Sequence, residues 1–117
     1  MTETHFSFDE IRSAAHDLAH ERRKARQDYE NHARLAADAE RDYRKKLAIE
    51  LTKFRSEEKG VGESEILANA EAADAKHRRD LEQSLAKAAL LRIDELERDG
   101  AFLRQLGSWS QELETVG

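Results

Sequence analysis

The first 59 residues of the chain contain neither glycine nor proline, and proline is absent from the whole sequence. These two residues are the ones that most often end or kink a helix. From Ile11 to Phe54, apolar and small residues return at helical spacing, with a period close to 3.6 residues. The pattern predicts one unbroken helix over residues 7–58. Its stripe consists of Ile11, Ala15, Leu18, Ala25, Tyr29, Ala36, Ala39, Tyr43, Leu47, Leu51 and Phe54.

The start of this helix has a signature of its own. Ser7 and Glu10 have the spacing of a capping box, and Phe6 and Ile11 flank that box at the positions of a hydrophobic staple. We therefore expect the helix to begin at Ser7. Residues 1–6 precede the cap and are expected to form a flexible N-terminus, because chain ends are poorly ordered unless something holds them.

A second helix is predicted after a short break at Lys59–Gly62. Gly60 suits the left-handed residue that ends a helix, and Glu63 places negative charge in the first turn of the next one. So short a link predicts a long antiparallel helical hairpin, similar to a coiled coil, whose second helix covers residues 63–106. The face expected to cover the first helix consists of Ile66, Ala70, Ala73, Leu81, Leu85, Ala88, Leu96, Leu103 and Leu106.

A further break is predicted near the C-terminal end. Gly107 suits a helix stop, and Ser108 and Gln111 follow it at the spacing of another cap. We expect a short helix over residues 108–115, with Gly100 as an alternative start of the break. Residues 7–117 are then expected to form a single helical-hairpin domain.

The composition supports an all-α fold. Ala, Glu, Leu, Arg and Lys make up 67 of the 117 residues, whereas Val and Ile together number 6, too few for a β-rich core. The chain has no cysteine, which excludes a disulfide scaffold, a Cys-ligated zinc site and a thiol nucleophile. No apolar run approaches the roughly 18 residues of a membrane span and no signal-like leader opens the chain, so we expect no membrane association.

No pattern of catalytic residues is found. His16 and His20 share a helix face, as the two histidines of a zinc-protease helix do, but Asp17 replaces the glutamate base and no third ligand is evident. Gly60 and Gly62 lack the preceding strand and third glycine of a phosphate-binding loop. Two thin helices also enclose no pocket. We expect a non-enzyme without metal or cofactor.

The second helix carries more apolar residues than one partner helix can cover. Leu90 and Leu91 project to either side of the expected contact face, so a second surface must bury them. A homodimer or higher oligomer is the commonest solution, and an unlike protein is the other. The residues expected at such an interface are Leu90, Leu91, Ile93, Phe102, Trp109 and Leu113.

Basic clusters on the first helix support an alternative function, that of a DNA-associated accessory protein. Clustered cations attract phosphates whatever the total charge, which here is -5. Acidic residues lie between these cations, so a solvated, salt-bridged face explains them more simply than a DNA-binding surface does. The candidate nucleic-acid contacts are Arg22, Arg23, Lys24, Arg26, Arg44, Lys45 and Lys46.

Several segments in the second half of the first helix and in the second helix form a recognisable pattern. They are Tyr43-Arg44-x-x-Leu47, Glu57-x-Lys59-Gly60-Val61-x-Glu63-x-Glu65, Arg78-Arg79-Asp80-Leu81, Ala86-x-Ala88-Ala89, Arg92, Leu96 and Leu103-x-x-Leu106. With these segments, just over half of the chain resembles a group of small helical-hairpin proteins of tailed phages and prophages, often encoded among replication, recombination and single-strand-binding genes. The resemblance implies a cytoplasmic site of action in a bacterial host and a phage or host protein as partner, as a replication or recombination accessory or an inhibitor of a host factor. It implies no defined activity.

Overall fold

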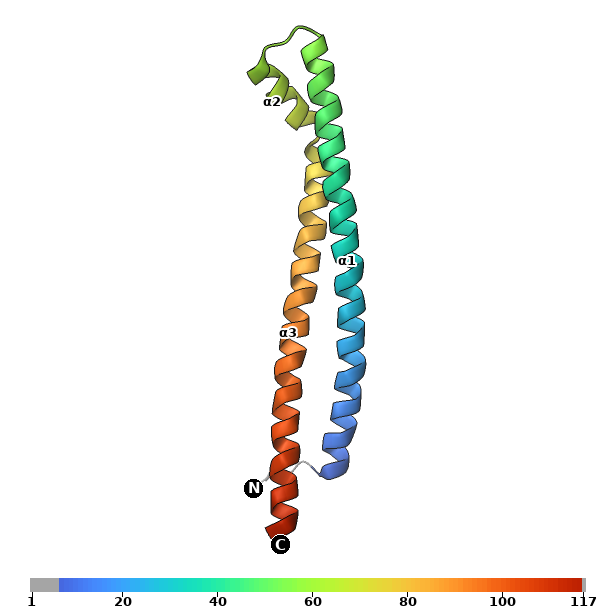
Figure 1. Ribbon diagram of the computed structural model, residues 1–117, viewed down its shortest axis with the longest axis vertical. Coiled ribbons are helices and arrows are strands. Elements are labelled where there is room, and N and C mark those ends of the chain that lie inside the picture. Colours follow the sequence, from blue (N-terminus) through green and yellow to red (C-terminus); the bar gives the residue numbers. More distant parts are fainter. Residues whose placement is uncertain (1–6, 117) are drawn as a thin grey trace. The chain divides into compact units, whose positions relative to one another are not determined.

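The structure, a computed structural model, describes the backbone of residues 7–116 and the side chains of residues 7–108. It contains three helices: α1 (Phe8–Ser56), α2 (Val61–Glu71) and α3 (Ala73–Val116). The chain runs in opposite directions along α1 and α3, and the short α2 connects them (Figure 1). The predicted all-α class and antiparallel hairpin are therefore confirmed.

The contacts within the chain divide into two compact units. The first unit joins the described parts of Met1–Asp28 and Ala89–Gly117, so that the beginning of α1 packs against the end of α3. The second unit, Tyr29–Ala88, contains the rest of α1, all of α2 and the beginning of α3. Each unit is an antiparallel helix pair, and α2 adds a third helix to the second unit.

The N-terminal cap of α1 forms at Ser7, as predicted. The Glu10 backbone N–H donates to the Ser7 hydroxyl at 3.1 Å, and the Ile11 N–H donates to the Ser7 carbonyl at 3.0 Å. The first of these bonds satisfies one of the amide donors that every helix leaves open at its start, and the second is the first backbone hydrogen bond of the helix itself. Phe6 and the expected flexibility of residues 1–6 lie outside the described residues.

The stripe predicted on α1 is at least partly buried at every position except Ala15. Ile11, Ala25 and Ala39 are its most buried members, at 8%, 6% and 1% exposure. Polar residues complete the stripe at the same helical spacing. They are Arg22, His32 and Glu50, of which Arg22 and His32 are half-buried and Glu50 is buried.

The turn after α1 differs from the prediction, because Glu58 and not Gly60 is the left-handed residue, with φ 62°. The Glu58 N–H donates to the Arg55 carbonyl at 3.1 Å, and the Lys59 N–H donates to the Phe54 carbonyl at 3.4 Å. These two bonds form a Schellman motif, which closes the helix two residues before the glycine. Gly60 is extended, with φ -62° and ψ 160°, and is the N-cap of α2.

We expect Glu58→Gly to raise the free energy of unfolding by about 0.5–1 kcal/mol. A left-handed conformation costs a residue with a Cβ roughly 1–2 kcal/mol, and the greater freedom of glycine in the unfolded chain offsets part of the gain. Urea unfolding followed by circular dichroism would measure the change. Glu57→Gly is the matched control, because Glu57 lacks a positive φ, and it should be neutral or destabilising. A stabilisation of equal size in both variants would contradict the prediction.

The second predicted helix, over residues 63–106, is wrong as one element, because the chain bends at Ala72. Ala72 has φ -91° and ψ 3°, and it separates α2 from α3. Ser64, Ala68 and Ala72 are all fully buried at 0% exposure. Their small side chains allow α2 to pack closely against the other helices of the second unit. In this position α2 is inclined to the beginning of α3 (Figure 1). No glycine or proline marks this bend, so packing and not local propensity decides it.

The predicted break at Gly100 or Gly107 and the short helix over residues 108–115 are also wrong, because α3 continues through both glycines to Val116. A glycine inside a helix costs only about 1 kcal/mol relative to alanine, which neighbouring helix formers and packing can outweigh. At Gly100 the packing comes from α1, since Leu18 Cδ2 would lie 3.5 Å from an added Cβ.

The face of α3 that packs against α1 differs from the predicted face in the first half of the helix, whereas the predicted Leu96, Leu103 and Leu106 are buried or half-buried. Leu81 and Leu85 are 50% and 39% exposed, and Ile66 in α2 is 72% exposed. The less exposed positions instead alternate at spacings of three and four, a period of 3.5 residues typical of coiled coils. They are Ala75, Arg79, Glu82, Ala86, Ala89, Ile93, Leu96, Gly100 and Leu103.

Candidate functional site

The contact between α1 and α3 in the second unit is polar at its centre. The Arg79 guanidinium lies over the Tyr43 ring, 4.5 Å from its centroid, and Arg79 Nε is 3.4 Å from Glu40 Oε2. Arg79 also donates to Asp80 Oδ1 at 2.8 Å. The pKa of Arg79 is raised above its usual value, first by this hydrogen bond and then by the negative charges of Asp80 and Glu40.

A second polar pair lies in the same unit. His32 Nδ1 is 3.6 Å from Glu82 Oε2, and both atoms are buried without a hydrogen-bond partner. His32 comes from α1 and Glu82 from α3. With Arg79 and Glu40 this pair places polar groups of both helices opposite one another, an arrangement that favours one register of the two helices. These groups therefore belong to the contact that holds α1 and α3 together in the second unit.

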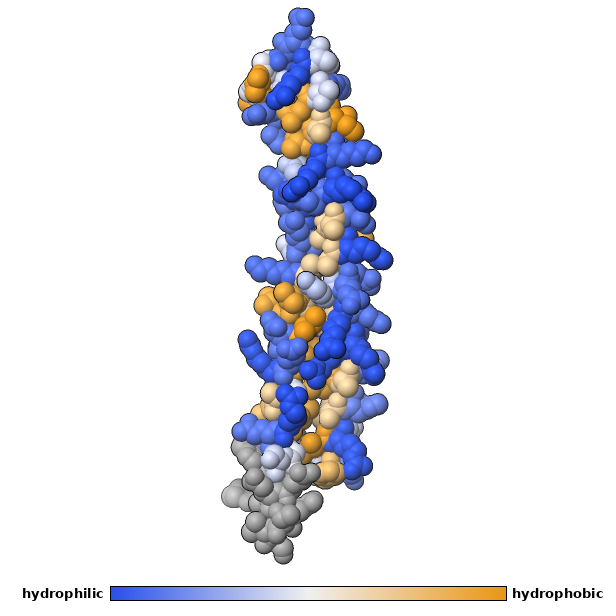
Figure 2. Space-filling model, viewed as in Figure 1, coloured by the Kyte–Doolittle hydropathy of each residue, from blue (hydrophilic) through white to orange (hydrophobic). Residues whose placement is uncertain are grey.

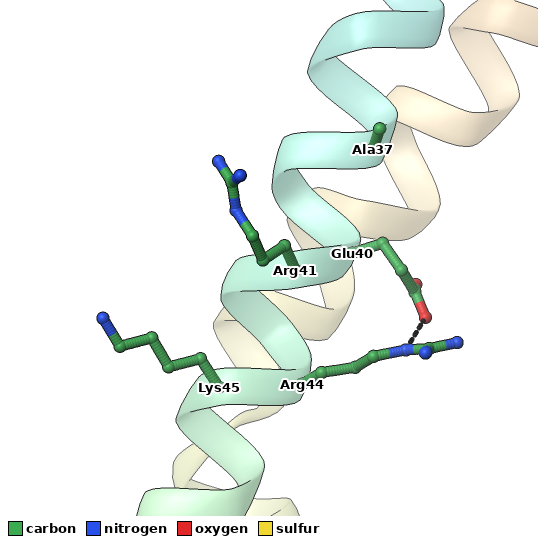
Figure 3. Close-up of a pocket in the computed structure, with 5 residues that line it drawn as sticks. All are labelled: Ala37, Glu40, Arg41, Arg44 and Lys45. Carbon is green, nitrogen blue, oxygen red and sulfur yellow. Dashed lines mark hydrogen bonds and ion pairs between the residues drawn. The ribbon is translucent and has the colours of Figure 1, made fainter.

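A hollow of about 490 Å³ lies beside Glu40 and is lined by Ala37, Glu40, Arg41, Arg44 and Lys45. All five residues belong to α1, so the hollow is a gap between side chains of one helix (Figure 3). Glu40 and Arg44 point toward each other and are joined by a hydrogen bond of 2.8 Å, whereas Arg41 and Lys45 point away from that pair. This shape gives no enclosed cavity for catalysis.

The predicted basic clusters differ in how their charges are paired. In the second unit, Arg44 pairs with Glu40, and Lys46 Nζ lies 3.1 Å from Glu50 Oε1. Lys45 is exposed. In the first unit, by contrast, no ion pair is formed by any of the four predicted cations with another described residue. They are Arg22, Arg23, Lys24 and Arg26.

Some of the apolar residues predicted to form an interface are exposed, and one is not. Leu90, Leu91 and Phe102 are 44%, 61% and 55% exposed, whereas Ile93 is half-buried in the contact between α1 and α3. Figure 2 shows hydrophobic residues as separate patches among hydrophilic ones on the face in view. The side chains of Trp109 and Leu113 lie outside the described residues.

The two candidate metal-binding histidines, His16 and His20, are both exposed on α1. Across residues 7–108, no three His, Cys, Asp or Glu side chains lie close enough to hold a metal ion. Within the part of the chain that the structure describes, no helix has the length and apolar character needed to cross a membrane.

The fold and its surfaces define an all-α helical-hairpin protein with a polar contact between its helices and exposed apolar residues on α3. No family model, curated protein or solved structure matches the chain. The site must therefore be interpreted from its own residues. Glu95, Arg98 and Arg104 are exposed residues of α3 on which the proposals below depend. Sequence patterns do not single them out, because their significance depends on which residues lie beside them in the structure.

Proposed function

We propose that the chain is a non-catalytic helical protein that associates with itself and binds another protein. The observation that carries the proposal is one outward face of α3 in the first unit. Leu91, Glu95, Arg98 and Phe102 follow one another at spacings of four, three and four residues, and all four are exposed. Since three helical turns take about 11 residues, the four side chains share one face.

This face is complementary to a second copy of itself. Its order is apolar, acidic, basic, apolar, so an antiparallel two-fold pairing places Leu91 opposite Phe102 of the second copy. The same pairing places Glu95 opposite Arg98 twice. A symmetric dimer requires such a self-complementary patch on each copy. The spacing of three and four residues also suits helix packing of the coiled-coil type.

The exposed apolar side chains favour this association. Full burial of a leucine or phenylalanine gains about 1.5–3 kcal/mol relative to exposure. Leu91 and Phe102 are both more than half exposed, so most of that gain is unrealised in the isolated chain. Leu90 lies one residue from Leu91 and would border the same interface. The resemblance to phage hairpin proteins supports a phage replication or recombination protein, or a host factor, as the unlike partner.

A charge exchange tests the proposed pairing. Glu95→Arg alone would place two cations opposite each other at two symmetric positions, and we expect the dimer to weaken at least tenfold. Adding Arg98→Glu restores opposite charges and should restore the association. Both variants lose the existing Glu95–Arg92 ion pair of 3.1 Å, so their difference reports only the contact between copies. Sedimentation equilibrium measures the dissociation constant.

For the unmodified protein we expect a mass of at least twice 13.4 kDa at micromolar concentration. A monomer under these conditions would show that self-association is wrong. A dimer that the double exchange fails to restore would place the contact on another face.

A further inference from the structure

Two arginines from different helices converge at one backbone position in the first unit. Gly100 of α3 is buried against α1, and a Cβ added there would lie 3.5 Å from Arg22 Nη1 and 3.8 Å from Arg104 Nη1. Arg22 comes from α1 and Arg104 from α3. The missing side chain of Gly100 leaves the space into which both guanidinium groups extend.

The two arginines and Gly100 line a hollow of about 210 Å³. Ala15, Leu18 and Leu103 supply the apolar part of its lining. Among residues 7–108, neither arginine has a carboxylate within ion-pair distance. Two like charges that lie close together, with no described carboxylate paired to either, repel each other, so an anion bound between them is favoured.

A second hollow, of about 240 Å³, shares Arg22 with the first. Arg22, Arg23 and Arg26 line it together with Ala19. The cations continue along α1, and none of them pairs with another described residue. By contrast, Arg41, Arg44 and Arg79 in the second unit each have a carboxylate partner.

We propose that Arg22 and Arg104, continued by Arg23 and Arg26, bind successive phosphate groups of a nucleic-acid strand. The planar guanidinium donates two parallel hydrogen bonds and matches the geometry of a phosphate. Arg22, Arg23 and Arg26 follow one another along α1, and this spread of cations suits a chain of phosphates rather than a single one. This binding site goes beyond the protein-binding function proposed above and rests on a different surface.

The surroundings of the cluster favour nucleic acid over a lipid surface. A helix that binds a membrane surface combines basic residues with large exposed apolar ones. Between Arg12 and Asp28 of α1, no large apolar side chain is among the exposed ones. On α3, Phe102 is exposed, but two residues turn a helix by about 200°, so it lies on the opposite side of α3 from Arg104. The phosphate backbone of nucleic acid requires only the cations.

Fluorescence anisotropy with the full chain tests the site. The probes are a labelled single-stranded 20-mer and its duplex, each at 50 mM and 200 mM salt, the range over which phosphate contacts weaken most visibly. The double variant Arg22→Gln, Arg104→Gln should weaken binding at least tenfold at 50 mM salt. The slope of log affinity against log salt should become shallower by roughly 1.4 for the single strand or 1.8 for the duplex, since two phosphate contacts are lost.

The matched control is Arg34→Gln with Arg55→Gln. Both residues are exposed on α1 outside the cluster, and the variant removes the same net charge. It should leave the affinity within twofold of the unmodified protein. An equal loss in both double variants would contradict a defined site and indicate general charge attraction.

A lysine variant and two other anionic probes, inorganic phosphate and phosphatidylserine vesicles, complete the test. If circular dichroism shows that the glutamine variant loses helicity, the variant Arg22→Lys with Arg104→Lys is measured in its place. The lysine variant keeps the charges and should retain the salt slope while binding more weakly, because lysine makes no bidentate contact. The absence of oligonucleotide binding would overturn the proposal, as would binding detected only to inorganic phosphate or only to phosphatidylserine vesicles.

Discussion

Replacing Leu91 and Phe102 together by glutamate is expected to convert the self-associated protein into a monomer. The proposed dimer would bury four of these side chains, which are 61% and 55% exposed in the single chain. If half of the usual gain of about 1.5–3 kcal/mol each is realised, the loss is about 3–6 kcal/mol. That loss raises the dissociation constant of the dimer roughly 10²- to 10⁴-fold. Sedimentation equilibrium should then return 13.4 kDa.

Leu81→Glu is the matched control for this experiment. Leu81 is 50% exposed on the same helix but belongs to the second unit, outside the proposed face. Its substitution should leave the mass of the assembly unchanged. Circular dichroism of each variant would show that the helices persist. If Leu81→Glu dissociates the assembly as completely, the interface does not lie at Leu91 and Phe102.

The second large effect concerns stability. We expect Leu96→Ala to lower the free energy of unfolding by about 2–4 kcal/mol, because it removes buried methyl groups and leaves a cavity. Leu96 is 2% exposed in the contact between α1 and α3 of the first unit. The loss is a large share of the 5–15 kcal/mol that stabilises a typical domain. Urea unfolding at one fixed protein concentration measures it, since self-association also adds to apparent stability.

Leu81→Ala provides the comparison for this substitution. The chemical change and the helix are the same, but half of the Leu81 side chain is already in water. We expect a loss of about 1 kcal/mol or less, because little buried surface is removed. Equal losses at the two positions would show that Leu96 is not part of the stabilising contact.

Part of the two candidate surfaces, the apolar face of α3 and the arginine cluster, could be predicted from the sequence. The surplus of leucines near Leu90 and Leu91 shows in the sequence, because two adjacent leucines cannot both face one partner helix. Their exposure in the structure agrees with this reasoning. The proposed pairing of Glu95 with Arg98 of a second copy could not be singled out in a chain with 25 acidic and 20 basic residues. The convergence of Arg22 and Arg104 depends on which residues of α1 lie beside Gly100.

Local features of the sequence determined the helices and their order. The absence of glycine and proline before Gly60 made α1 one helix, and Ser7 set its start. The short link after α1 made α3 return antiparallel to it. These features are set by backbone sterics and by hydrogen bonds between residues close in sequence, so they can be recognised without knowledge of the partner helix.

Only the tertiary structure decided the bend at Ala72, the continuity of α3 at Gly100 and the face that α3 turns toward α1. Leu81 and Leu85 offered the more hydrophobic face, but α3 places Arg79 and Glu82 against Tyr43, Glu40 and His32. In a helix rich in alanine and charge, several faces differ little in hydrophobicity. The matching small and oppositely charged residues of the partner helix then select one register, and no single helix contains that information.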